Sequence, residues 1–293
     1  MIAQFALRLI CGMSLMWALM PRRQVTSGFF RIQMLVVMGL GTLAALSTGM
    51  EAQSILRDTG SSALATVLPS PFAAAFPSGL IAALGFIGSV LWTLERRTSG
   101  GGIGFGVLSL SAAELTTSLA GTGHDRYIIY WGDTIVRSGA PVVSSACPAF
   151  LAIVSEFANA GVLGGAVVGM LLGHWYLTAP TMSIAPLNRI NLYFGIASVL
   201  RLMASVTILA LLMSGQLRSL EPAPQLGPVP SAWLGLRWLA GVFGPLIVSL
   251  MVWRILKYRN TQAATGVLFV GVILAFIGDM TAALLLRETG LPL

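Results

Sequence analysis

Residues 263–286 read AATGVLFVGVILAFIGDMTAALLL, a run of 24 positions with a single ionisable side chain, Asp279. About 20 mostly apolar residues in a helix cross the roughly 30 Å hydrocarbon core of a bilayer. The stretch is therefore long enough and apolar enough to span a membrane. A carboxylic acid inside such a helix needs a polar partner, because an ionised group is costly in hydrocarbon.

The whole chain shares this character. Its 293 residues carry 17 basic and 10 acidic side chains, 9% in all, whereas soluble proteins average about 25%. Hydrophobic residues make up 56%, and the mean hydropathy is +0.86. These values exclude a soluble enzyme and a disordered chain. The net charge of +7 does not indicate nucleic-acid binding, because the arginines lie between apolar blocks and so report membrane topology.

The sequence predicts an all-α, polytopic membrane protein with eight transmembrane helices. The fourth predicted span has the weakest signal, since it is rich in Gly, Ser and Thr and contains Glu114. Pro245 lies inside the seventh and is expected to kink it, because proline removes a helical hydrogen bond. The predicted spans are residues 2–20, 29–50, 76–94, 102–120, 149–177, 190–214, 232–256 and 263–286.

The basic residues predict the orientation. Nine of them lie in the short connections 1–2, 3–4, 5–6 and 7–8, and five lie in the longer connections on the opposite side. Cytoplasmic loops carry the excess of Lys and Arg. We therefore expect a multi-pass protein of a bacterial-type cytoplasmic (inner) membrane, with both termini outside the cytoplasm. The predicted outer connection at residues 121–148 contains a run of charged and aromatic residues, 124–131. This run suits an interfacial belt or a segment that plugs the outer mouth.

The two halves of the chain show a weak duplication. Glu114 and Asp279 occupy the same distance from a preceding Gly-Val pair, at Gly106-Val107 and Gly271-Val272. A unit of four spans returns the chain to its starting side, so two copies would lie parallel. The pattern predicts a first four-helix half at 1–120, an outer loop at 121–148 and a second four-helix half at 149–293. The halves also share a Trp followed by basic residues, at Trp92 with Arg96 and at Trp253 with Arg254. The alternative is that these shared Trp and Arg positions only mark the membrane interfaces.

Five of the ionisable residues inside the predicted spans are candidates for a functional site, and their depths place them in one zone, mostly in the outer part of the membrane. Such groups face a bundle interior, a wet cavity or a counter-charge. Three acids against two arginines leave one carboxyl without a formal counter-charge, and that arrangement suits proton binding and release. The alternative is that Arg–carboxylate pairs only join helices. The candidates for ion or proton coupling are Asp279, Glu114, Glu156, Arg201 and Arg8.

A second candidate site is His174-Trp175-Tyr176, at the predicted cytoplasmic end of the fifth span. It fits a quinone or lipid-headgroup contact, or an interfacial belt whose histidine bonds to the following loop. No cofactor is predicted. A haem held by two histidines is disfavoured, because His124 lies in an outer loop at the other face from His174. A haem held by one histidine and one methionine stays formally open, although no spacing favours it, and a bound quinone stays an option. No metal-ligand spacing is visible.

Two glycine-rich stretches favour close packing of helices rather than chemistry. One, Gly161, Gly164, Gly165 and Gly169, follows a helical spacing, and the other, residues 100–106, is interpreted as a flexible turn with a small-residue face. No arrangement of a nucleophile and a base is visible, so no independent enzymatic activity is predicted.

Two functions fit these patterns. The first is a proton- or ion-coupled carrier with its site between the two four-helix halves. The second is an accessory or quinone-facing membrane subunit of a respiratory or electron-transfer complex. The expected partners are the lipid bilayer and, in the second case, other membrane subunits, with no nucleic acid in either.

Overall fold

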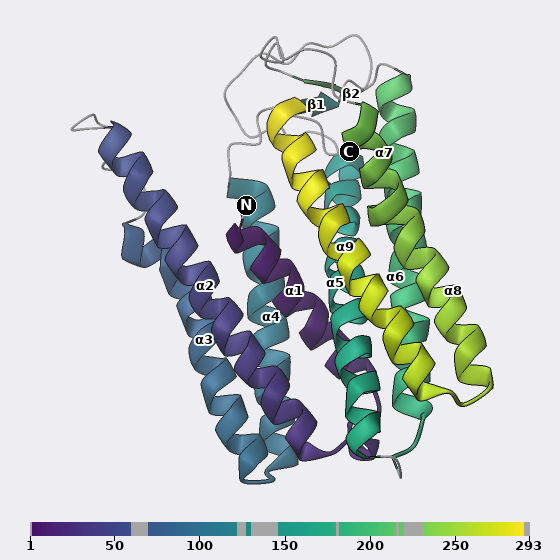
Figure 1. Cartoon of the computed structure of the whole chain (residues 1–293). Coiled ribbons are helices and arrows are strands. Elements are labelled where there is room, and N and C mark those ends of the chain that lie inside the picture. The colour runs from purple at the N-terminus through teal and green to yellow at the C-terminus, as the bar shows by residue number, and fades with distance from the viewer. Residues whose placement is uncertain are drawn as a thin grey trace. The chain divides into compact units, whose positions relative to one another are not determined.

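The computed structural model describes residues 2–59, 70–121, 127–129, 146–179, 182–214, 217–219 and 231–289. These residues form long helices with short connections (Figure 1). The α-helices are α1 (Ile2–Leu19), α2 (Ser27–Thr59), α3 (Pro71–Thr93), α4 (Arg97–Gly121), α5 (Ala146–Thr178), α6 (Ala185–Met213), α7 (Ser231–Trp238), α8 (Gly244–Lys257) and α9 (Thr261–Thr289). A 3₁₀ turn, η1 (Arg22–Gln24), links α1 to α2, and a π-helical turn, η3 (Leu239–Phe243), joins α7 to α8.

Each of the eight predicted spans coincides with helix, the seventh being built from α7, η3 and α8 together. Among the described residues, seven helical stretches are long and apolar enough to cross a membrane. The eighth, α4, is long enough but is not among these seven, in line with its weak signal in the sequence. The chain therefore has the architecture of an integral membrane protein. The type of membrane and the orientation of the termini stay predictions.

The helices pack into two compact units, unit 1 at Met1–Leu115 and unit 2 at Thr116–Leu293. In unit 1, α2 packs against both α1 and α3. The α2–α3 contact is close because Gly85 has no side chain: a Cβ there would lie 2.7 Å from the backbone nitrogen of Met38. The predicted four-helix halves and their duplication stay predictions.

Unit 2 is built around α5, which packs against α6 and α9, while α8 packs against α6 and α9. Its apolar core includes Leu163, Leu172, Phe194 and Leu268. The predicted glycine face of α5 is confirmed for three members. A Cβ on Gly161 would meet Ala197 at 2.9 Å, one on Gly165 would meet Phe194 at 2.9 Å, and Gly169 faces α6 and α9.

A π-helical turn immediately precedes Gly244 and Pro245, and the predicted kink at Pro245 stays a prediction. Proline cannot donate the backbone hydrogen bond of an α-helix, and its ring crowds the carbonyl four residues earlier. Immediately before it, Gly244 N–H reaches back five residues to the Leu239 carbonyl, which is the π-helical pattern. The chain thus inserts a wide turn between α7 and α8.

The α3–α4 and α8–α9 connections each contain a residue with positive φ, which allows a tight turn. Glu95, between α3 and α4, has φ 55°, and Arg259, between α8 and α9, has φ 54°. Arg97 already begins α4, so the prediction of a flexible turn at residues 100–106 is wrong: these glycines are helical. Their predicted role as a packing face is confirmed, because Gly100 contacts Trp92 and Gly104 contacts Met34.

Two of the predicted outer connections meet in a short antiparallel ribbon. Strand β1 (Tyr127–Ile129) pairs with β2 (Leu217–Ser219), with Ile128 opposite Arg218. The aromatic run 124–131 includes β1, but its side chains lie outside the described part of the chain. Its predicted interfacial or plugging role stays a prediction.

Candidate functional site

The most buried of the five candidate ionisable residues is Asp279 on α9. Its side chain is 1% exposed, and its Oδ1 atom accepts a hydrogen bond from the Asn159 amide of α5. Asn159 is itself 5% exposed. The two meet because α5 and α9 pack side by side in unit 2. A neutral amide is therefore one direct partner of a carboxyl group in an otherwise apolar helix.

The residue before Asp279 makes the closest backbone contact of this region. Gly278 lies against Gly241 in the π-helical turn, so closely that a Cβ on Gly278 would be 2.1 Å from the Gly241 Cα. Arg237, buried at the end of α7, lies over the same glycine: a Cβ on Gly241 would be 2.6 Å from Arg237 Nη1. The guanidinium of Arg237 and the π-helical turn are thus neighbours of the α9 segment that carries Asp279.

Arg201 is buried in α6, within a polar stripe of that helix. Asn191, Ser198 and Ser205 are also buried, and their spacing from Arg201 places all four on one face. Asn191 Nδ2 donates a 3.0 Å hydrogen bond to the Ser249 carbonyl of α8. The stripe gives unit 2 a second line of buried polar groups besides the Asn159–Asp279 pair.

In unit 1, Glu114 of α4 is half-buried and accepts a hydrogen bond from the buried Ser78 hydroxyl of α3. Glu114 and Asp279 are the two positions that match in the sequence. Each accepts a hydrogen bond from a neutral side chain of its own unit, but the donors come from the third helix of one half and the first helix of the other. The likeness is therefore one of chemistry, and it does not test the duplication.

The two remaining ionisable candidates, Arg8 and Glu156, lie in different units. Arg8 is buried in α1 of unit 1, and Glu156 is half-buried in α5 of unit 2. All five candidates, and Arg237, have interaction partners, as charges in an apolar setting require. Because Arg8 and Glu114 belong to unit 1 and the others to unit 2, the convergence of all five on one pocket stays a prediction.

The second candidate site lies at the end of α5. His174 is exposed, Trp175 is half-buried, and Tyr176 is buried. The Tyr176 hydroxyl donates a hydrogen bond to the Ser183 carbonyl in the loop that follows. Tyr176 thus makes the loop contact that the belt alternative assigned to the histidine. The quinone or lipid contact of His174 stays a prediction.

Sequence reasoning missed two residues of the Asp279 region, Asn159 and Arg237. Asn159 is the one amide in the apolar run 157–172, which is a usable signal for a buried polar contact. Arg237 stands near the edge of its predicted span, where an arginine ordinarily extends to the interface. Within the described ranges, no group of three or more His, Cys, Asp or Glu residues could hold a metal ion.

Compared with known protein families, with characterised proteins and with solved structures, the chain matches none.

Proposed function

We propose that the protein is a proton-coupled membrane carrier and that Asp279 is the group that binds and releases the proton. The observation that carries the proposal is the near-complete burial of this carboxyl on an apolar helix, hydrogen-bonded to an amide. Ionisable residues inside membrane spans commonly mark ion pathways and proton relays. An ionised aspartate at the centre of a span costs about 2.5–3.5 kcal/mol on insertion scales, so the position needs a reason.

The Asn159 partner is compatible with the proposal. Its amide can donate to the carboxyl oxygen whether or not the carboxyl carries a proton. Arg237, at the end of α7, places a buried positive charge beside the neighbouring π-helical turn. Protonation of Asp279 would change the local charge balance next to that turn.

The adjoining backbone supports coupling to a movement. π-Helical turns are rare and often lie at functional sites, because the wide turn frees the backbone from the regular α-helical pattern. Here the turn lies against Gly278 with no side chain between the two backbones. A change of charge at Asp279, in this proposal, alters the packing of the π-helical turn against Gly278. In this proposal, Arg201 and the α6 stripe contribute polar groups to the transport path.

The test uses the purified protein in liposomes on a solid-supported membrane, where charge movement is recorded with and without a proton gradient. The solutes are inorganic cations, inorganic anions, amino acids, organic acids and organic amines. We expect at least one solute to produce a gradient-dependent current that Asp279→Asn abolishes. Glu95→Gln makes the same carboxyl-to-amide change at an exposed turn and should leave the current intact.

Two results would contradict the carrier proposal. One is a wild-type current that Asp279→Asn leaves unchanged at every pH. The other is the absence of current for every solute, together with co-purification of cytochromes or redox subunits in mild detergent. The second result would favour the accessory or quinone-facing subunit, for which the exposed His174 is the residue to substitute first.

A further inference from the structure

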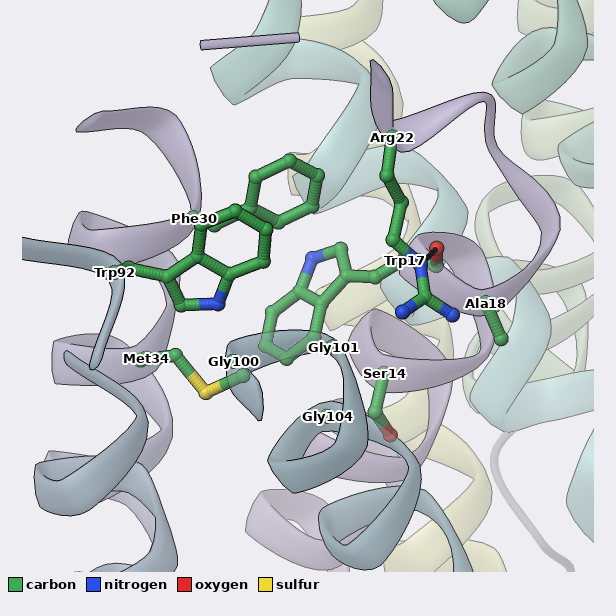
Figure 2. Close-up of a pocket in the computed structure, with 10 residues that line it drawn as sticks. All are labelled: Ser14, Trp17, Ala18, Arg22, Phe30, Met34, Trp92, Gly100, Gly101 and Gly104. Carbon is green, nitrogen blue, oxygen red and sulfur yellow. Dashed lines mark hydrogen bonds between the residues drawn. The ribbon is translucent and has the colours of Figure 1, made fainter. Parts of the chain in front are cut away.

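A small hollow lies in unit 1 at the end where α1 and α3 finish and where α2 and α4 begin (Figure 2). Its walls include the indole rings of Trp17 and Trp92, the ring of Phe30, the Arg22 side chain and glycines of the first turns of α4. Trp92 stacks on Phe30 with ring centroids 4.4 Å apart. The hollow is thus an aromatic box with one cationic wall.

Both tryptophans present buried hydrogen-bond donors in this box. Each side chain is 3% exposed, and in the part of the chain that the structure describes neither Nε1 atom has a hydrogen-bond partner. In Figure 2 the two indoles lie next to each other, with the Trp92 nitrogen on the edge toward Trp17. A buried N–H without an acceptor is costly, and buried indoles ordinarily find one. The two indole N–H groups of this box are therefore available to donate hydrogen bonds to a bound acceptor.

Arg22 is held in place on the third side. Its Nε atom donates a 3.0 Å hydrogen bond to the Trp17 carbonyl, and its guanidinium carbon lies 4.5 Å from the centre of the Phe105 ring. Nη1 occupies the space beside Gly101, only 2.6 Å from where a Cβ would be. Burial lowers the pKa of this guanidinium, and a negative partner would stabilise its charged form.

The charges around the hollow favour an anion over a water molecule. The connecting segments at this end, residues 20–31 and 94–99, carry five arginines and one acid, Glu95. None of the residues that line the hollow is acidic. A water molecule could accept from the indoles, but it would leave the guanidinium without a counter-charge. A negatively charged oxygen satisfies both requirements.

We propose that this hollow binds one oxygen of a phosphate group, contributed by an anionic lipid headgroup or by free phosphate. The hollow has a volume of about 10 Å³ and accommodates about one water-sized atom, so the rest of the phosphate lies outside. Trp17 and Trp92 donate through their indole N–H groups, and Arg22 supplies the charge-assisted bond. The glycines of α4 keep the entrance open, since a Cβ at Gly100 would lie 2.8 Å from Trp92 Nε1.

The test follows the indole N–H signals of the full-length protein, labelled with ¹⁵N-tryptophan in detergent micelles, by nuclear magnetic resonance. Trp17→Phe and Trp92→Phe assign the two signals. The probes are sodium phosphate, sodium chloride at matched ionic strength, and short-chain phosphatidylglycerol. We expect saturable shifts of both signals with phosphatidylglycerol, with phosphate, or with both, and none with chloride. Shifts with the lipid alone identify a headgroup site, whereas equal affinity for inorganic phosphate identifies a site for free phosphate.

Two charge variants separate the site from the surface charge. Arg22→Gln should weaken binding by about tenfold or more, as expected for loss of a hydrogen bond to a charged group. Arg23→Gln removes the same charge from the next, exposed residue and should change the affinity less than about twofold. If Arg22→Gln fails to fold, Trp92→Phe keeps an aromatic ring and should still weaken the Trp17 response, with Trp253→Phe as its control.

The proposal is overturned if neither phosphate probe shifts the two signals, if chloride shifts them equally, or if Arg23→Gln weakens binding as much as Arg22→Gln.

Discussion

Gly278→Ala is expected to destabilise unit 2, because the added methyl group has no room. A Cβ at this position would lie 2.1 Å from the Cα and 2.7 Å from the nitrogen of Gly241, both backbone atoms that no side-chain rotation can move. Ordinary contact begins at 3.4 Å, so α9 and the π-helical turn would have to separate by about 1.3 Å. Overpacking costs about 1–3 kcal/mol, and a clash between two backbones should lie at the upper end of that range.

Gly266→Ala is the matched control, since it makes the same chemical change in the same helix. A Cβ at Gly266 would meet nothing within 4 Å. Alanine is more favourable than glycine in a helix interior by about 1 kcal/mol, so this variant should be slightly stabilised. Both variants gain the same helix propensity, so they should differ by the overpacking cost alone, about 3 kcal/mol in free energy of unfolding, and should have opposite signs.

The assay is equilibrium unfolding in mixed micelles, followed by far-ultraviolet circular dichroism as the denaturing detergent is increased. The midpoint should fall for Gly278→Ala and stay level or rise for Gly266→Ala. Equal shifts in the same direction would refute the reasoning, because they would show that the π-helical turn and α9 do not approach closely at Gly278.

Two further substitutions test other contacts. Gly165→Ala should lower the free energy of unfolding by about 1–3 kcal/mol in the same assay, because its Cβ would meet Phe194 of α6 at 2.9 Å. A change in stability no larger than that of Gly266→Ala would contradict this prediction. Glu95→Gly should raise the free energy of unfolding by up to about 1 kcal/mol, because φ 55° is unfavourable for residues with a Cβ. Glu95→Ala keeps the Cβ and should give no gain in stability.

The helices could be predicted from the sequence because a span of hydrocarbon dictates length and polarity directly. A backbone in lipid must satisfy its own hydrogen bonds, and about 20 apolar residues in a helix are the simplest solution. All eight predicted spans are helical for this reason. The ends are less well predicted: α2 continues nine residues beyond its predicted end at residue 50, because helical backbone can extend past the apolar part.

The partners of the buried polar groups could not be predicted. Asp279 is conspicuous as a lone acid in an apolar run, but nothing in the spacing indicates that Asn159, 120 positions earlier, is its donor. Pro245 predicts a disturbance of the α-helix, but the sequence does not indicate that Leu239–Phe243 form a π-helical turn before it. The unpartnered indoles of Trp17 and Trp92 resemble any interfacial tryptophan until the helix ends are brought together.

The amino-acid pattern alone was sufficient to predict a helical membrane protein, the places of its long helices, and the few side chains whose burial in hydrocarbon costs free energy. These properties depend on the local balance of polar and apolar groups along one helix. Tertiary structure alone decided which donor faces which carboxyl group, that a π-helical turn touches α9 through two glycines, and that two indoles and an arginine enclose one hollow. Such contacts depend on the packing of helices distant in the chain, which no local pattern encodes.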